Sequence, residues 1–152
     1  MNVFEFLTEE AQSVVRRLNA VVEHYPATAD WTWDQAFEET KKDISMLTEH
    51  LKKETVIESN VGDAAQALVE PMSKAAEQRK DINSSVDNVL MIHVDEAGFK
   101  EGVKQIAEKL TDHNEFCSRD YYPLLQKHIS ANSLQNIQDQ LQFSLPGAAQ
   151  QS

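Results

Sequence analysis

The sequence has one cysteine, four glycines, four prolines and few positively charged residues, and each of these scarcities excludes a class of protein. A single cysteine, Cys117, cannot build a disulfide framework within the chain and fits a reducing compartment. The low glycine and proline content argues against a β protein with many turns. Fourteen lysines and arginines against 25 acidic residues give a net charge of −11, which disfavours nucleic acid and anionic membranes as partners.

Long hydrophobic runs are also missing. No stretch approaches the roughly 18 apolar residues of a membrane span, and the acidic N-terminal residues do not resemble a secretory signal. A chain of 152 residues can bury one core without needing a disulfide or a metal to fold. We therefore expect a cytoplasmic protein with one domain over residues 1–145 and a disordered tail over residues 146–152. Since no phosphate loop, nucleophile elbow or zinc-protease motif is present, the sequence does not predict an enzyme.

What the sequence does contain is helical periodicity. Apolar residues recur every three or four positions and predict helices over residues 3–23 and 33–58, between 63 and 91, and from about 98 onward. Pro26 ends the first helix, Thr32 and Gln35 form a capping box for the second, Pro71 kinks the third or starts it, and Pro123 bends or ends the fourth. Residues 130–143 form a short amphipathic tail helix. Short connections make neighbouring helices antiparallel, so we predict an all-α, up-down antiparallel four-helix bundle with a short C-terminal tail helix.

Polar residues stand in two of the apolar stripes. His50 and Glu54 are four residues apart in the second helix and share one face, and His113 and Cys117 are four apart in the fourth. Side chains that project inward from facing helices of a bundle are a common way to hold a metal ion. The alternative is a metal-free interior in which His50 and Glu54 form hydrogen bonds and Cys117 packs as a small hydrophobic residue.

The helical rise predicts what lies beside each histidine. Counting back through the turns places His50 at the level of residues 7–11 of the first helix, and His113 at the level of residues 76–78 of the third. His24 and His93 lie at the turns, roughly 20 Å from that level, so we do not expect them to complete a site.

The ordered set of motifs resembles the hemerythrin-like, or HHE cation-binding, domain family over about residues 4–128. The strongest likeness is His113 and Cys117 followed by an aromatic pair and Pro123, ten residues after the histidine. His50 and Glu54 form an intact His-x-x-x-Glu motif. The resemblance implies a four-helix bundle with a non-haem di-iron site.

Three positions depart from the family pattern. Ala11 and Gln78 stand where the resemblance implies histidines, and Cys117 stands where it implies a bridging carboxylate. Too few nitrogen and oxygen ligands remain for an ordinary di-iron centre, so we do not expect oxygen carriage. His50, Glu54, His113 and Cys117, with Gln78 lining the site, make a tetrahedral ligand set for at most one divalent metal ion, zinc or iron.

Three functions stay open. The first is a binding or sensing protein with this reduced cation-binding site. The second is a metal-free interaction module that binds a protein partner or forms a homodimer, through exposed Trp31 and Trp33 or through the tail helix. The third is redox sensing by Cys117, which its place in the core stripe disfavours because a sensor thiol is exposed.

Overall fold

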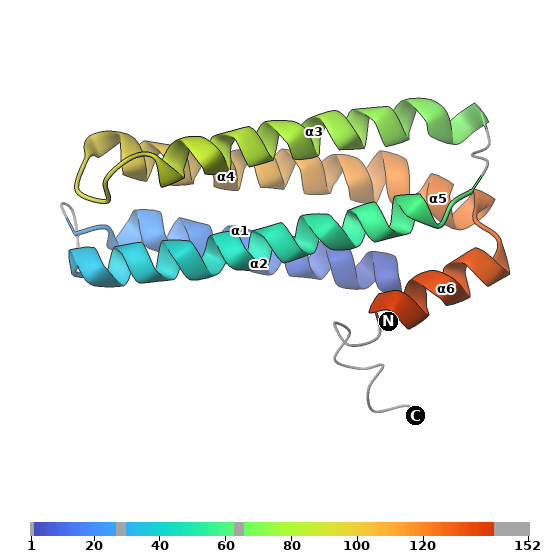
Figure 1. Ribbon diagram of the computed structural model, residues 1–152, viewed down its shortest axis with the longest axis horizontal. Coiled ribbons are helices and arrows are strands. Elements are labelled where there is room, and N and C mark those ends of the chain that lie inside the picture. Colours follow the sequence, from blue (N-terminus) through green and yellow to red (C-terminus); the bar gives the residue numbers. More distant parts are fainter. Residues whose placement is uncertain (1, 27–29, 63–65, 142–152) are drawn as a thin grey trace.

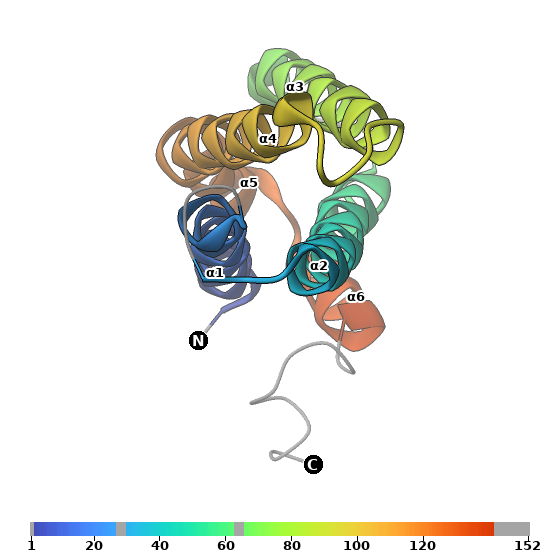
Figure 2. The same ribbon diagram turned by 90° about the vertical axis from the view of Figure 1, so that its left-hand side faces the viewer.

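The computed structural model describes residues 2–26, 30–62 and 66–141, and the regular structure within these ranges is entirely helical. The elements are α1 (Val3–His24), α2 (Trp33–Ser59), α3 (Gln66–Leu90), α4 (Ala97–Phe116), the π-helical turn η1 (Cys117–Tyr121), α5 (Tyr122–His128) and α6 (Ala131–Leu141). The long helices α1, α2, α3 and α4 lie side by side around a common interior (Figures 1 and 2). The all-α prediction is confirmed, whereas the predicted disordered tail, residues 146–152, lies outside the described residues.

The helix ends follow local sequence signals. Asn2 caps α1 by accepting a hydrogen bond from the backbone N–H of Glu5. Both hydrogen bonds of the predicted capping box between Thr32 and Gln35 are present at the start of α2. Pro71, for which the sequence allowed two roles, lies inside α3 rather than at its first position.

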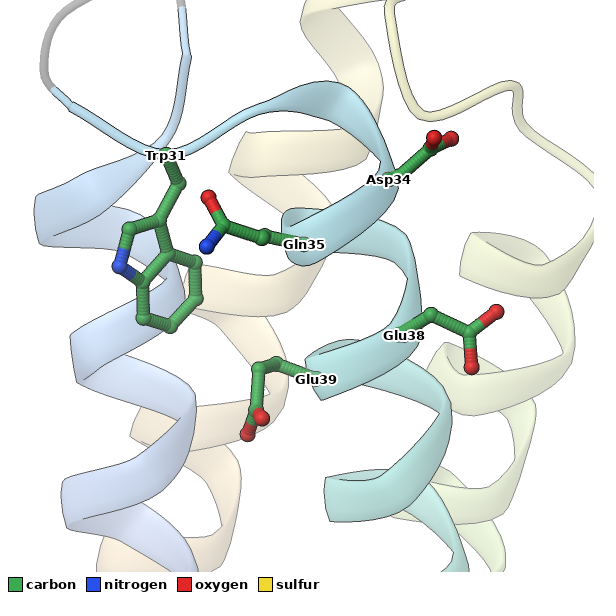
Figure 3. A pocket seen from close by; sticks show the side chains of 5 residues that line it. All are labelled: Trp31, Asp34, Gln35, Glu38 and Glu39. Carbon is green, nitrogen blue, oxygen red and sulfur yellow. The ribbon is translucent and has the colours of Figure 1, made fainter.

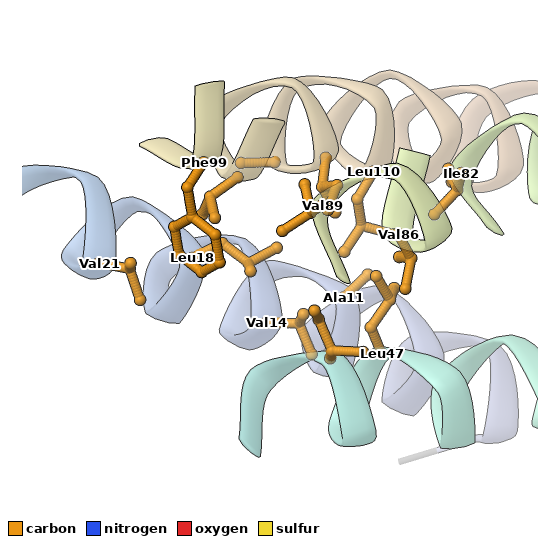
Figure 4. Close-up of a cluster of buried hydrophobic side chains, with 14 of the residues drawn as sticks. Ala11, Val14, Leu18, Val21, Leu47, Ile82, Val86, Val89, Phe99 and Leu110 are labelled. Carbon is orange, nitrogen blue, oxygen red and sulfur yellow. The ribbon is translucent and has the colours of Figure 1, made fainter. Parts of the chain in front are cut away.

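One apolar cluster fills the half of the interior next to the α1–α2 turn. It combines side chains from α1, α2, α3 and α4, among them Leu18, Leu47, Val86 and Leu110 (Figure 4). Helix α1 packs against α2 and α4, and α3 packs against α4. The four side chains named above lie on the apolar stripes that the sequence predicts for their helices.

A second apolar cluster fills the other half of the interior. It includes Leu7, Cys117 and Tyr121, together with Ile137 and Leu141 of α6. The predicted tail helix is therefore present as an element of the fold, and Figure 1 shows it beside the end of α2.

The fourth long helix widens into η1 before it continues as α5, a feature that the sequence analysis missed. The N–H of Tyr122 donates to the carbonyl of Cys117, five residues back, as in a π-turn. Pro123 explains the change, because its ring excludes the carbonyl four residues earlier from the normal helical position and it has no N–H to donate. Both Cys117 and Tyr121 are buried in this wide turn.

None of the helices within residues 2–26, 30–62 and 66–141 is long and apolar enough to cross a membrane. The cytoplasmic location stays a prediction from the sequence.

Candidate metal centre

A band of buried polar side chains separates the two apolar clusters. His50, Glu54, His113 and Cys117 are each at most 3% exposed, so all of the predicted ligands lie inside the protein. Helical periodicity puts them there: His50 and Glu54 follow Leu47 on the inward face of α2, and His113 follows Leu110 on that of α4. The prediction that these polar residues face the interior is confirmed for each of them.

His50 bridges α1 and α2. Its Nδ1 lies 2.8 Å from Oε1 of Glu10, and its Nε2 lies 3.1 Å from Oε2 of Glu54. The other oxygen of Glu10 accepts a hydrogen bond of 2.6 Å from Lys53. Glu10 falls within residues 7–11, the level that the helical rise predicted for His50.

His113 bridges α3, α4 and α2. Its Nδ1 lies 2.6 Å from Oε1 of Gln78, and its Nε2 lies 2.7 Å from Oε1 of Glu54. The predicted level of His113, residues 76–78, is therefore correct. Gln78 contacts the site by orienting the ring of His113. It is not itself a donor aimed at the centre of the site.

The two histidines are oriented in the same way. A carboxylate or amide oxygen only accepts hydrogen bonds, so Nδ1 of His50 donates to Glu10 and Nδ1 of His113 donates to Gln78. In a neutral imidazole the second nitrogen, Nε2, then presents a lone pair. Both lone pairs face oxygens of Glu54, so a positive charge, a proton or a metal ion, is required between each Nε2 and the carboxylate.

The carboxylate of Glu54 is the centre of this arrangement. Its Oε1 accepts a hydrogen bond from Arg79 and lies 2.7 Å from Nε2 of His113. Its Oε2 has no hydrogen bond despite complete burial and contacts Nε2 of His50 without hydrogen-bond geometry. Burial opposes ionisation of Glu54, but its contacts with His113 and His50 outweigh burial and hold its pKa far below the ordinary value. Burial likewise opposes a charged His50, but Glu10 and Glu54 raise its pKa to about 9.

Three of the four predicted ligands converge on one point. Ligand atoms of Glu54, His113 and Cys117 all lie within 4.8 Å of one another, so this buried group can hold a single metal ion. Sγ of Cys117 lies 3.6 Å from Nε2 of His113, near the roughly 3.3–3.7 Å that separates ligand atoms around a tetrahedral zinc ion. His50 is not part of this group, because it reaches Glu54 from the other oxygen.

An ion-pair network next to Glu54 was missed by the sequence analysis. Arg79 binds Glu58 through two nitrogens, at 2.9 and 2.5 Å, and Tyr121 donates a 2.8 Å hydrogen bond to the same carboxylate. A signal was present, because the apolar stripe of α3 skips from Ala75 to Ile82 and Arg79 fills the inward position between them. Glu58 lies one turn beyond Glu54 on the same helix.

The fixed charges of the buried cluster do not balance. Three carboxylates, those of Glu10, Glu54 and Glu58, face two permanent cations, Lys53 and Arg79. The interior therefore lacks positive charge when both histidines are neutral. A protonated histidine or a divalent ion supplies what is missing, so the donor set fits a metal ion on electrostatic grounds as well as by geometry.

The tryptophans lie at the far end of the molecule, about 25 Å from His50 by helical rise. Trp31 stacks on the ring of His24 with 5.1 Å between centroids, and Trp33 sets its edge against Tyr25. A shallow hollow beside Trp31 is lined by Asp34, Gln35, Glu38 and Glu39 (Figure 3). Trp31 thus packs on the end of the core, whereas Trp33 is 40% exposed.

Comparison of the chain with protein-family models, with curated proteins and with solved structures finds no match. The functional interpretation rests on the buried site. At the two positions where the resemblance implies histidines, Ala11 is buried in the apolar core and Gln78 orients His113.

Proposed function

We propose that this chain is a hemerythrin-like, up-down four-helix bundle with a reduced cation-binding site, and that it acts as a binding or sensing protein with one divalent metal ion. Glu54, His113 and Cys117 hold the ion. The observation that supports this most strongly is the convergence of two oriented histidines on one buried carboxylate that keeps an unsatisfied oxygen. In metal sites, ligating histidines are commonly oriented by a hydrogen bond from their other ring nitrogen, as His113 is by Gln78.

The chemistry of the donor set favours zinc over a pair of irons. Imidazole, thiolate and carboxylate together suit a tetrahedral zinc ion. When bound, the ion supplies positive charge and Lewis acidity to a dry interior. Three protein ligands leave a fourth position, and His50, the predicted fourth ligand, lies against the second oxygen of Glu54. Its coordination of the ion stays a prediction.

Each neighbour has a defined task in this proposal. Gln78 fixes the ring of His113, and Glu10, held by Lys53, fixes the ring of His50. Burial raises the pKa of the Cys117 thiol far above its ordinary value, so the free protein keeps the thiol protonated. A bound metal ion displaces that proton, because the thiolate is the ligand.

The metal-free interaction module is the second candidate. A specific observation favours it: Glu10 and Glu54 raise the pKa of His50 to about 9, so a proton meets part of the charge requirement of the interior. In that case the buried polar side chains only stabilise the helical bundle, and the protein functions by binding a protein partner or by forming a homodimer. Redox sensing is disfavoured, because Cys117 is 1% exposed and its raised pKa makes it a poor nucleophile.

Metal content separates the two candidates. The purified protein, reconstituted separately with zinc and with iron and then desalted, should retain about one equivalent per chain by mass spectrometry of the element. His113→Ala should abolish retention, whereas His24→Ala, the same change at a half-buried histidine at the far end of α1, should leave it intact. Absence of metal after both reconstitutions refutes the metal site and leaves the interaction module.

A further inference from the structure

A fixed cation already occupies the space beside Glu54. The guanidinium of Arg79 donates a hydrogen bond to Oε1 of Glu54 at 3.2 Å, and it also donates to both carboxylate oxygens of Glu58. The Arg79 side chain is only 9% exposed, and that of Glu54 only 2%. A buried guanidinium keeps its charge, because arginine does not lose its proton in proteins.

The groups that surround this guanidinium are oxygen donors. Glu54 and Glu58 lie one turn apart on α2, and the hydroxyl of Tyr121 joins them from η1. Two carboxylates and a hydroxyl are ligands that hard divalent cations such as Mn²⁺ prefer. The same carboxylate, Glu54, belongs to the group with His113 and Cys117 and keeps one oxygen without a hydrogen bond.

We propose that Arg79 is a built-in cation that fills a second metal position, between Glu54 and Glu58, and thereby limits the site to one metal ion. Glu54 is then shared by two cations, the metal ion of the proposed function and the guanidinium, and His113 and Arg79 both contact its Oε1. The proposal rests on the proposed function for the first ion only. It makes Arg79 a determinant of metal stoichiometry, a role that an ordinary structural ion pair does not have.

The two roles predict opposite results when the guanidinium is removed. Arg79→Met has an unbranched, neutral side chain and frees two carboxylates that remain close together. If Arg79 fills a cation position, an added divalent ion takes its place and restores the fold. If Arg79 is only a structural partner, the freed carboxylates gain no ion, and the buried negative charges are left without compensation.

The experiment measures Mn²⁺ retention of zinc-loaded protein after desalting, with helicity followed by circular dichroism. Wild type should retain one zinc and no manganese. Arg79→Met should retain one zinc and about one manganese, with an affinity for Mn²⁺ at least tenfold higher than that of wild type. Arg79→Lys, which keeps the charge, should behave as wild type, and the double variant Arg79→Met with Glu58→Gln should lose the manganese again.

Each outcome decides one of the two proposals. No zinc in wild type overturns the proposed function, and Mn²⁺ binding by zinc-free Arg79→Met that disappears with Glu58→Gln still supports the role of Arg79. Failure of folded Arg79→Met to gain manganese overturns that role. So does an Arg79→Met protein that stays unfolded with and without Mn²⁺, because a cation that fits the position restores folding.

Discussion

Replacement of Glu54 by glutamine tests the central claim that one carboxylate balances the buried cations. Glu54 contacts His113 at 2.7 Å, His50 at 3.1 Å and Arg79 at 3.2 Å, with its side chain 2% exposed. Glutamine has nearly the same shape but no charge, and its amide nitrogen donates instead of accepting. The variant leaves the positive charge of Arg79 paired with Glu58 alone and removes the partner of both histidines.

The magnitude follows from burial. Removing one partner of a buried ion pair destabilises a protein by about 3–5 kcal/mol, because the remaining charge is left without compensation. For a domain of this length, 1 kcal/mol corresponds to about 2–4 °C in melting temperature. We therefore expect Glu54→Gln to melt about 6–20 °C lower than wild type in a buffer with chelator, where no metal contributes.

The matched control is Glu49→Gln, the same change on the same helix. The Glu49 side chain is 63% exposed and pairs only with Lys52, so its loss should change stability by less than about 0.5 kcal/mol. Urea denaturation, followed by circular dichroism, measures all three proteins under identical conditions. Equal stability of Glu54→Gln and Glu49→Gln would refute the reasoning, because the buried network then has no need of the Glu54 charge.

Three further outcomes are expected from the same fold. Gly102→Ala should destabilise the protein by about 1–3 kcal/mol in urea denaturation, because its Cβ would lie 2.4 Å from Cγ2 of Val89, whereas Gly98→Ala meets its nearest side chain at 3.5 Å and should not. Burial raises the pKa of Asp43, so the folded chain binds this proton more tightly than the unfolded chain, and the resulting stability is lost as the pH rises from 3.8 through the raised pKa. Asp43→Asn should therefore become more stable relative to wild type over that rise, measured by urea denaturation at low and neutral pH, and a difference that is independent of pH would contradict this. Cys117 of the metal-free protein should react with a thiol reagent only as fast as the protein opens, and rapid labelling of the folded chain would show that its burial is misjudged.

Helical periodicity was enough to predict the depth of the site. A constant rise per residue and short turns fix which levels of neighbouring helices face each other, so His50 was placed beside residues 7–11 and His113 beside residues 76–78. The contacts with Glu10 and Gln78 agree with both placements. Periodicity is misleading at the start of α2, where the apolar spacing that leads to Ile44 and Leu47 predicts Phe37 in the stripe, but Phe37 is 42% exposed and Ala36 is buried instead. In a sequence, a large apolar residue at the edge of a stripe resembles a core residue. The rotation of the helix about its axis decides whether that residue or its neighbour faces the interior.

Charged residues in the interior were harder to predict, because the sequence marks them at most by a gap in an apolar stripe, as at Arg79 in α3. A long charged side chain, such as that of Arg79 or Glu10, is seldom buried unless it is paired. Their burial depends on partners from other helices, Glu58 for Arg79 and His50 for Glu10. The π-turn at Cys117 was missed for a similar reason. Pro123 indicates that the regular helix is interrupted, but not whether the helix bends, ends or widens.

The charge balance of the interior shows why folding cannot decide the function. A proton on His50, and a divalent ion whose binding removes the proton of Cys117, add the same net charge beside Glu54, and both leave Nδ1 of His50 and His113 donating outward. The apolar clusters on either side of the polar band, and the permanent charge of Arg79, are the same in the two states. We therefore expect the protein to fold with or without metal. Because both states are folded, the metal content of the native protein, with His113→Ala as its control, decides between the metal site and the interaction module.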